Sequence, residues 1–285
     1  TSGIGRECAL RLARADAQVV LVARTVEKLD STLAEIAAAG GTARAYACDV
    51  ADLAACDRLV RDVSADLGGA DILINNAGRS IRRSVRYSYD RFHDFERTMQ
   101  LNYFGALRLI TGFLPGMEAR QEGQIINISS IGVLTSPPRF SAYVASKAAL
   151  DAFSLCAAPE YRHCNIEFTT IHMPLVRTPM IAPTGLYKAF PTLSPEQARD
   201  LVMRAIVTRT KKVSTSLGVA GALAQATMPS FTEAFLSQAY ELFPDSPAAR
   251  GLSEAEAAAE LADLPSSRLA LARRLFSQVM RGGHW

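Results

Sequence analysis

Residues 124–147 read QIINISSIGVLTSPPRFSAYVASK. The first five are a mostly apolar run typical of a buried parallel strand, and Ser130 follows at the carboxyl end of that strand. The stretch then enters a predicted helix over residues 141–161, on which Tyr143 and Lys147 are four residues apart and share one face. A serine at the end of a strand can meet a tyrosine on the next helix at the mouth of an open α/β sheet, which is where such sheets bind ligands.

Three polar side chains of this stretch, Ser130, Tyr143 and Lys147, suit the reduction of a carbonyl group. The carbonyl oxygen gains negative charge during reduction and needs a proton donor. A tyrosine phenol titrates near pH ~10, and a neighbouring lysine ammonium is expected to lower that pKa. A serine hydroxyl can donate a hydrogen bond to the same oxygen. The alternative is an exposed tyrosine and lysine on an ordinary helix, because this spacing alone is common by chance.

Three further motifs accompany this set. Residues 1–5 read Thr-Ser-Gly-Ile-Gly, residues 75–78 read Asn-Asn-Ala-Gly after an apolar strand at 71–74, and Asn102 lies inside a predicted helix over 89–114. Over residues 1 to about 180, the ordered set resembles the short-chain dehydrogenase/reductase family. The resemblance implies an α/β fold, a doubly wound Rossmann-type parallel sheet with helices on both faces, which binds a nicotinamide cofactor. It also implies four catalytic residues, with Asn102 bending its helix and holding a water that relays protons to the lysine: Asn102, Ser130, Tyr143 and Lys147.

The chain begins inside the glycine turn that the family places after its first strand. Of the family's three glycines in this turn, only the last two, Gly3 and Gly5, are present. The first strand is central in the family's sheet, and its neighbours would lose their hydrogen-bond partners without it. We therefore expect the polypeptide to extend upstream of residue 1.

The cofactor is expected along the carboxyl ends of the first strands. A helix predicted over 6–15 starts after Gly3, where free backbone N–H groups favour a pyrophosphate. The strand at 18–23 ends at Arg24, where an acid would accept the ribose hydroxyls of NAD, whereas arginine suits the 2′-phosphate of NADPH. The alternative is a solvated arginine at a strand end. The resemblance implies cofactor contacts from Ser2, Gly3, Ile4, Gly5, Arg24, Asp49, Val50, Asn76, Ala77, Gly78, Tyr143, Lys147, Pro174, Val176 and Thr178.

The resemblance gives some of these positions particular roles. Asp49 would accept a hydrogen bond from the adenine amino group, and Lys147 would hydrogen-bond the nicotinamide ribose. Thr178 would bind the nicotinamide carboxamide or the pyrophosphate. The family usually has a glycine after the proline, whereas Leu175 follows Pro174 here, so the backbone path at this point is open.

The remaining pattern divides the chain into a reductase domain over 1–215 and a helical extension over 216–285. Pro159 is expected to kink or stop the helix over 141–161 near its end. The extension repeats apolar residues at helical spacing, and packing on the core or on another subunit is favoured over a cover for a long-chain substrate or contact with a membrane surface.

Other predicted elements are helices at 26–39 and 54–67, the latter capped by Asp52, strands at 42–47, 166–171 and 211–215, a mobile lid at 181–193, a helix starting at Ser194, and helices at 254–260 and 269–280.

Composition narrows the class of protein. The chain has 285 residues, 49% of them hydrophobic, and a net charge of +3 that is spread along the sequence. This suits one large α/β domain and does not suggest a nucleic-acid partner. No apolar run approaches the ~20 residues of a membrane span, and no signal peptide is visible. The cysteines form no C-x-x-C pair and the histidines no ligand cluster, so we expect reduced thiols, a cytoplasmic protein and no metal.

Several segments point to a substrate. Residues 172–184, 242–246 and 284–285 are similar to the fatty acyl-CoA reductase branch of the family, in which this domain is often the carboxyl-terminal half of a longer protein. The resemblance implies NADPH-dependent reduction of a long-chain fatty acyl-CoA to a fatty aldehyde. Four arginines near the expected substrate entrance could attract the phosphates of coenzyme A, although a solvated loop is as good an interpretation. They are Arg79, Arg82, Arg83 and Arg86.

Two other functions stay open. One is a general NADPH-dependent reductase of ketones or aldehydes of lipid or polyketide type. The other is a non-catalytic scaffold, which the presence of the complete catalytic set disfavours. The family resemblance implies a homo-oligomer with the helix over 89–114 in the interface, and an upstream domain in the same polypeptide is expected.

Overall fold

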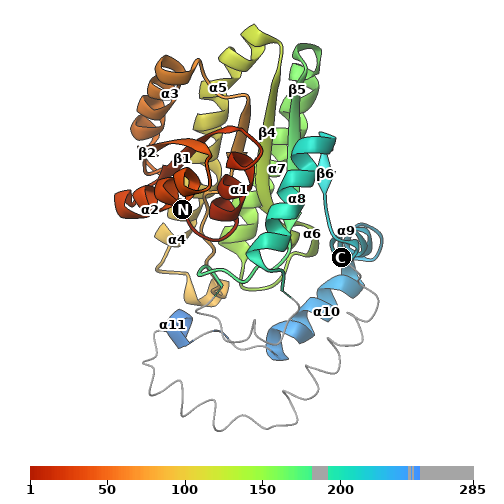
Figure 1. Cartoon of the computed structure of the whole chain (residues 1–285). Coiled ribbons are helices and arrows are strands. Elements are labelled where there is room, and N and C mark those ends of the chain that lie inside the picture. Colours follow the sequence, from red (N-terminus) through yellow and green to blue (C-terminus); the bar gives the residue numbers. More distant parts are fainter. Residues whose placement is uncertain (182–191, 243–244, 246, 251–285) are drawn as a thin grey trace.

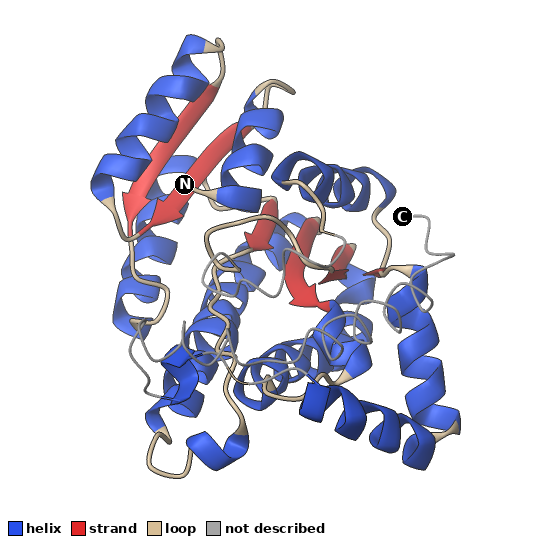
Figure 2. Ribbon diagram, turned by 90° about the horizontal axis from the view of Figure 1, so that it is seen from below, coloured by secondary structure: helices blue, strands red, loops and turns tan. Residues whose placement is uncertain are grey.

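The computed structural model describes residues 1–181, 192–242, 245 and 247–250. Its strands are all parallel and form two ladders, one of two strands (β1–β2) and one of four in the order β3-β4-β5-β6. Figure 2 shows the ladders as separate groups of arrows, and no described pairing joins them. We expect the family's first strand to be missing from this chain. The strands are β1 (Gln18–Ala23), β2 (Thr42–Ala47), β3 (Ile72–Asn75), β4 (Gly123–Ser130), β5 (Ile166–Met173) and β6 (Lys212–Val213).

Helices cover both faces of the strands, as the α/β pattern predicts (Figure 1). Side chains alternate between the faces. Ile125 packs in the core under α3, α5 and α7, while its neighbour Ile126 packs in the core under α1 and α8. The α-helices and the π-helix before β6 are α1 (Gly3–Ala13), α2 (Val26–Ala38), α3 (Leu53–Leu67), α4 (His93–Met99), a π-helix (Gln100–Gly105), α5 (Ala106–Arg120), α6 (Ile131–Thr135), α7 (Ser141–Tyr161) and α8 (Pro195–Thr208).

Local sequence signals set several helix ends as expected. Asp52 caps α3 by accepting from the N–H groups of Ala54 and Ala55, and Gly68 ends that helix in the left-handed region at φ 77°. Ser194 and Gln197 form a capping box at the start of α8. These ends depend only on neighbouring residues, which is why sequence alone predicts them.

The predicted helix over 89–114 is wrong at both ends. Helical structure begins at His93 and is interrupted by the π-helix that contains Asn102. It then runs through Pro115 to Arg120, and Pro159 likewise lies inside α7, which continues to Tyr161. The buried face of α5, including Leu114 and Met117, continues past its proline, so tertiary packing outweighs the lost hydrogen bond. The strand predicted at 211–215 is also shortened, to β6.

The described part of the helical extension begins with α9, which packs beside α6. It contains α9 (Ser216–Thr227), α10 (Pro229–Leu242) and α11 (Pro247–Arg250). Gly218 and Gly221 let α9 approach α6 closely, since a Cβ on Gly221 would lie 2.8 Å from the Thr135 side chain. The side chains of Leu223 and Phe231 remain 62% and 68% exposed, so packing on the core, the favoured interpretation, does not account for them.

The expected lid, the last two predicted helices and the oligomer interface stay predictions. Most of the expected lid and both helices predicted after residue 253 lie outside the described residues, although Leu193 at the lid's end pairs with Val176 in a parallel bridge. The oligomer interface stays a prediction, and Phe104 and Leu155 are exposed apolar side chains on the helices concerned. None of the helices that the structure describes is long and apolar enough to cross a membrane.

The close approach of the π-helix to the chain after β2 yields a test of the fold. A Cβ on Gly105 would lie 2.1 Å from the carbonyl oxygen of Val50. We expect Gly105→Ala to lower the free energy of unfolding by about 2 kcal/mol or more, because overpacking of this kind forces the backbone apart. Gly116→Ala, on α5 with only the Arg120 guanidinium nearby at 3.4 Å, should instead stabilise by roughly 0.5–1 kcal/mol. Urea denaturation of both variants checks the contrast, and equal stabilities would contradict the packing described.

Candidate active site

The glycine turn forms the floor of a cradle at the start of α1. Gly3 has φ 49°, and an added Cβ there would lie 2.9 Å from the Thr178 side chain. A Cβ on Gly5 would lie 2.8 Å from Nδ2 of Asn76. The residues after β3 and after β5 therefore meet the turn. The N-cap residue Ser2 makes no side-chain capping bond to this eleven-residue helix. The backbone N–H groups in the first turn of α1 suit a pyrophosphate. This cradle therefore fits the pyrophosphate of a nicotinamide dinucleotide.

Arg24 and Asp49 lie side by side where β1 and β2 end. Arg24 is 73% exposed at its side chain, and its guanidinium is 4.0 Å from Asp49 Oδ2. Asp49 Oδ1 accepts from the N–H of Ala51. The two side chains are thus placed at the edge where the adenosine half of the cofactor is expected.

Ser130, Tyr143 and Lys147 meet where β4 ends and α7 begins. Ser130 Oγ accepts the Gly132 N–H at 3.0 Å, which fixes the hydroxyl at the start of α6, and it lies near enough to the Tyr143 phenol to lower the pKa of that group. Lys147 is buried on α7, and its Nζ donates to the carbonyl of Ile128 on β4 at 2.7 Å. The structure therefore brings the predicted set together.

The pKa of Tyr143 differs from the sequence-based expectation. The sequence predicts that the Lys147 ammonium lowers the pKa of the phenol. Burial instead raises the pKa of the phenol, while the hydrogen bond from Ser130 lowers it and the charge of Asp151 raises it. Burial also lowers the pKa of Lys147 to about 8, against a raising effect of Asp151. Burial dominates both because each charged form loses its hydration.

Asn102 lies in the π-helix with all of its amide atoms engaged. Its Oδ1 accepts the N–H of Arg79, and its Nδ2 donates to the Arg79 carbonyl and to Ser146 Oγ, each at 2.9 Å. A Cβ on Gly78 would lie 3.2 Å from Asn102 Oδ1 and 3.4 Å from Lys147 Nζ. Asn102 lies in a π-helix, a feature frequent at functional sites, whereas the bend implied by the family resemblance stays a prediction. Its side chain ties the segment after β3 to the catalytic helix.

The other predicted cofactor residues line or support this edge. Ile4 and Val176 pack in the core beneath α1 and α8, and Pro174 is buried after β5. Val50 packs against Gly105, so its side chain belongs to the core. Ala77 is exposed between Asn76 and Gly78.

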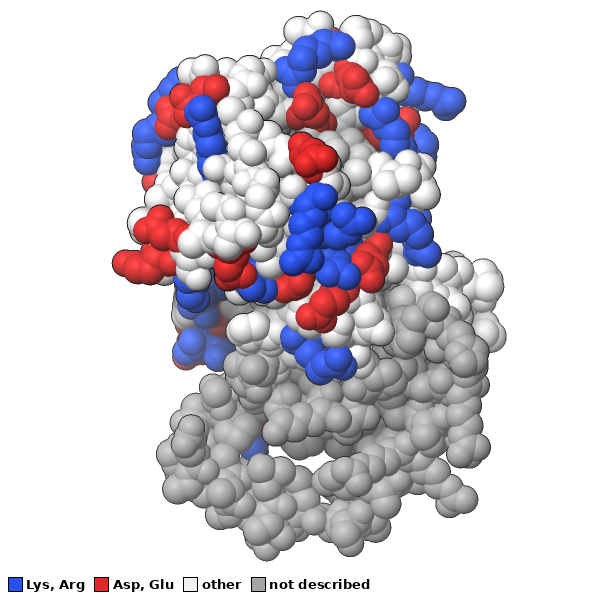
Figure 3. All heavy atoms as spheres, viewed as in Figure 1, with Lys and Arg blue, Asp and Glu red and all other residues white. Residues whose placement is uncertain are grey.

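The arginine cluster is not a uniform basic patch. Arg83 forms an ion pair with the buried carboxylate of Asp94, and its side chain is largely buried. Arg86 lies over the rings of Tyr87 and Tyr240, at 5.1 and 5.8 Å from their centroids. On the face drawn in Figure 3, basic and acidic side chains likewise lie next to one another.

Two charged pairs near the site were not predicted from the sequence. Asp151 and His172 form a buried pair beneath α7, and the spacing of Tyr143, Lys147 and Asp151 by four residues each is the signal that could have found it. Arg139, just before α7, forms a buried ion pair with Asp245 of the extension. These residues are 106 apart in the sequence, so no local pattern reveals their contact.

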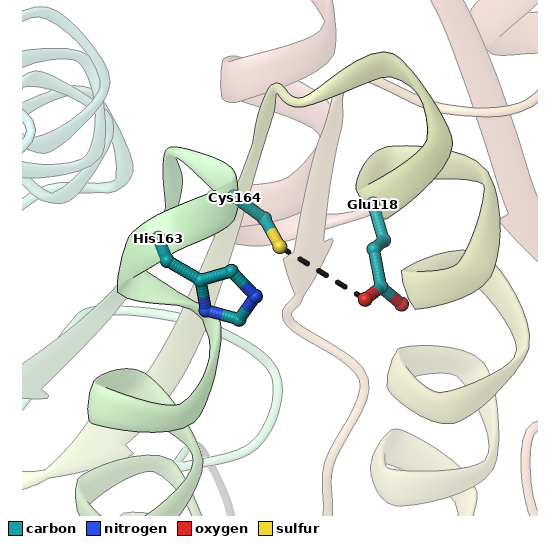
Figure 4. A group of neighbouring side chains, drawn as sticks. All are labelled: Glu118, His163 and Cys164. Atoms are coloured by element: carbon teal, nitrogen blue, oxygen red, sulfur yellow. Dashed lines mark hydrogen bonds between the residues drawn. The ribbon is translucent and has the colours of Figure 1, made fainter.

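A further polar group lies at the other end of β5 (Figure 4). Glu118, His163 and Cys164 bring a carboxylate, an imidazole and a thiol within 4.8 Å of one another. The group contains a single histidine, and the expectation that the chain holds no metal stays a prediction. The Cys164 thiol donates a long hydrogen bond of 3.9 Å to Glu118. The group precedes β5, whereas Ser130 pairs with Met173 at the end of that strand, so it takes no part in the catalytic arrangement.

Known proteins are similar to this chain in sequence. Residues 1–187 match the profile of the short chain dehydrogenase family. A fatty acyl-CoA reductase of Acinetobacter baylyi is 52% identical over the whole chain, which covers 92% of that protein. A fatty acyl-CoA reductase of Mycobacterium tuberculosis is 46% identical over 77% of this chain and 75% of its own length.

Solved structures agree with the fold. A metagenomic short-chain oxidoreductase in complex with NADP is 29% identical, with a TM-score of 0.63 over 74% of this chain and 89% of its own. A short-chain dehydrogenase from Streptomyces avermitilis is 28% identical, with a TM-score of 0.69 over 83% and 92%. The chain therefore belongs to the short-chain dehydrogenase family of oxidoreductases.

Proposed function

We propose that the protein is an NADPH-dependent reductase that converts a long-chain fatty acyl-CoA to a fatty aldehyde. The observation that carries the reductase chemistry is the meeting of Ser130, Tyr143 and Lys147 beside the glycine cradle. The choice of substrate is supported by the fatty acyl-CoA reductase of Acinetobacter baylyi, which is similar along the whole chain.

The catalytic residues act on the carbonyl oxygen. NADPH, when bound, supplies the hydride. Ser130 accepts the Gly132 N–H, so its own hydroxyl proton can be donated to the substrate oxygen. Tyr143 has a raised pKa and so carries its proton at neutral pH, ready to give it to the oxygen as charge develops. With a thioester substrate, the protonated adduct is a hemithioacetal. When it collapses, the carbon–sulfur bond breaks, the hydroxyl proton returns to the Tyr143 phenolate or to the expelled coenzyme A thiolate, and the aldehyde is left.

Lys147 supports Tyr143 in this scheme. Its ammonium is anchored on the Ile128 carbonyl and is suited to hydrogen-bond the nicotinamide ribose. A positive charge one helical turn from the phenol favours the phenolate that remains after proton transfer. Asn102 positions the catalytic helix through Ser146.

The selection of NADPH rests on Arg24. The end of β1 offers an exposed guanidinium and no acid in the position that would bind the ribose hydroxyls of NAD. The structural relative in complex with NADP supports this choice. We also place the enzyme in the cytoplasm, where its five free cysteines would remain reduced.

The acyl chain is proposed to lie along the extension. α9 packs on α6, which directly follows Ser130, so the extension is near the reacting carbonyl. Leu223, Phe231 and Phe235 leave apolar surface uncovered on α9 and α10. Burial of such surface against a hydrocarbon chain is favourable at ~0.8 kcal/mol per methylene.

The role of Tyr143 gives a first test. Tyr143→Phe should lower turnover by a factor of roughly 100 or more, because the proton donor is lost, while NADPH affinity stays nearly unchanged. Steady-state kinetics and fluorescence titration of NADPH measure the two quantities. Tyr46→Phe, which removes an exposed hydroxyl bound to Asp66, is the matched control. Near-normal turnover of Tyr143→Phe would remove the assignment.

The role of Arg24 gives a second test. Arg24→Ala should weaken NADPH binding by roughly 1–3 kcal/mol, the cost of losing hydrogen bonds to a charged group. NADH, which lacks the 2′-phosphate, should bind with unchanged affinity. Calorimetric titration measures the affinity of the variant for each cofactor. An equal loss of affinity for NADPH and NADH would mean that Arg24 does not contact the phosphate.

The substrate gives a third test. Specificity should rise with acyl length until the apolar surface is covered, and Phe231→Ser with Phe235→Ser should flatten that rise. Val207→Ser, an exposed apolar residue on α8, is the control. NADPH oxidation is measured with acyl-CoAs of graded length and with a fatty aldehyde, at two salt concentrations, since phosphate attraction weakens with salt. Activity on ketones or aldehydes with none on any acyl-CoA would favour the general carbonyl reductase.

A further inference from the structure

A buried polar pair lies between the catalytic helix and the sheet. Nε2 of His172, on β5, is 2.8 Å from Oδ2 of Asp151, on α7. Nδ1 of His172 is 3.1 Å from the hydroxyl of Ser214, just after β6. His172 and Asp151 are 5% and 8% exposed. The Asp151 carboxylate can only accept, so Nε2 of His172 donates to it, whereas the Ser214 hydroxyl can serve either role at Nδ1.

The Asp151 carboxylate has one engaged oxygen and one unengaged oxygen. His172 binds Oδ2, whereas Oδ1 is buried without a hydrogen-bond partner among the described residues. A buried carboxylate oxygen without a donor keeps its negative potential, which acts strongly on nearby groups in a medium of low polarity. Asp151 lies one helical turn after Lys147 and two turns after Tyr143, on the same face of α7.

The surroundings of Lys147 contain few other ionisable groups. On α7 these are Tyr143 and Asp151, and β5 contributes His172 through its contact with Asp151. Nζ of Lys147 also donates to the carbonyl of Ile128, which does not ionise. The charge of Asp151 therefore opposes the burial that disfavours the ammonium.

We propose that Asp151 is a positioning residue of the reductase, whose carboxylate, anchored by His172 and Ser214, holds Lys147 in its ammonium form at the working pH. The proposal rests on the role of Lys147 under the proposed function, and it holds for any carbonyl substrate. Burial already lowers the pKa of Lys147 to about 8 with Asp151 in place. Loss of the carboxylate lowers that pKa further, so a growing share of Lys147 becomes neutral near pH 7 and no longer supports Tyr143.

Lysine titration tests this directly, without substrate or cofactor. The chain has five lysines, so selective ¹³C labelling at Cε gives few resonances, and Lys147→Met assigns the one of interest. Asp151→Asn is expected to lower the proton affinity of Lys147 by about tenfold or more, given a unit charge one turn away. His172→Gln, which keeps a donor for Asp151, should leave the titration near the wild-type value. Asp57→Asn removes an exposed carboxylate paired with Arg108 and is the control.

The pH–rate profile provides the functional readout. Reduction needs the ammonium, so activity is present below the pKa of Lys147 and is lost as pH rises through it. In Asp151→Asn this alkaline loss should move to lower pH, with turnover near that of the wild type at the acidic end of the profile. A purely structural defect would lower activity by the same factor at every pH.

The outcomes separate this inference from the proposed function. An unchanged Lys147 titration in Asp151→Asn overturns the inference, whatever the enzyme reduces. A shifted titration supports it even if acyl-CoA is not a substrate, and the pH profile is then measured with the carbonyl compound that is reduced. If Asp151→Asn misfolds, Asp151→Leu combined with His172→Leu removes the pair without leaving one partner buried alone. The same fall in the proton affinity of Lys147 is expected in that double variant.

Discussion

The hydrogen bond from the buried Lys147 ammonium to the carbonyl of Ile128 is the contact on which the site depends. It joins α7 to β4, one of the two inner strands of the larger ladder, near the carboxyl end of that strand. A polar seam continues beneath the helix, where Asn75 donates to Asn127 and Asn127 donates to Ser154 of α7, each at 2.8 Å. Because buried polar groups are costly unless they are paired, these bonds fix one seating of α7 on the sheet. The position of Tyr143 relative to Ser130 follows from that seating.

Close backbone contacts complete the site from the other side. Glycines at positions 3, 5 and 78 leave no room for a side chain against Thr178, Asn76 and Asn102. The segments after β3 and β5 can therefore approach the start of α1. A cofactor bound across these segments would touch residues from three separate parts of the chain, which is how an open α/β sheet builds a ligand site from strand ends.

The helical extension is joined to the site by a buried charge cluster. Asp245 accepts from the backbone N–H and hydroxyl of Ser84 and pairs with Arg139 at 3.0 Å. The Arg139 guanidinium stacks on the ring of Tyr240 at 4.0 Å. These contacts hold α10 against the segment before α7. Burial of this pair is compensated by additional hydrogen bonds, the condition under which a buried ion pair is tolerated.

The sequence alone determined the α/β fold, several helix ends and the chemical character of the catalytic set. These features depend on short-range spacing: a period of two or 3.6, a capping residue, or four residues between Tyr143 and Lys147. Sequence did not determine the course of the chain through Pro115, the pairing of Arg83 with Asp94, or the raised pKa of Tyr143. Only the tertiary structure decided the Asp151–His172 pair and the docking of the extension through Arg139 and Asp245, because these contacts join distant segments and depend on burial, which local patterns do not encode.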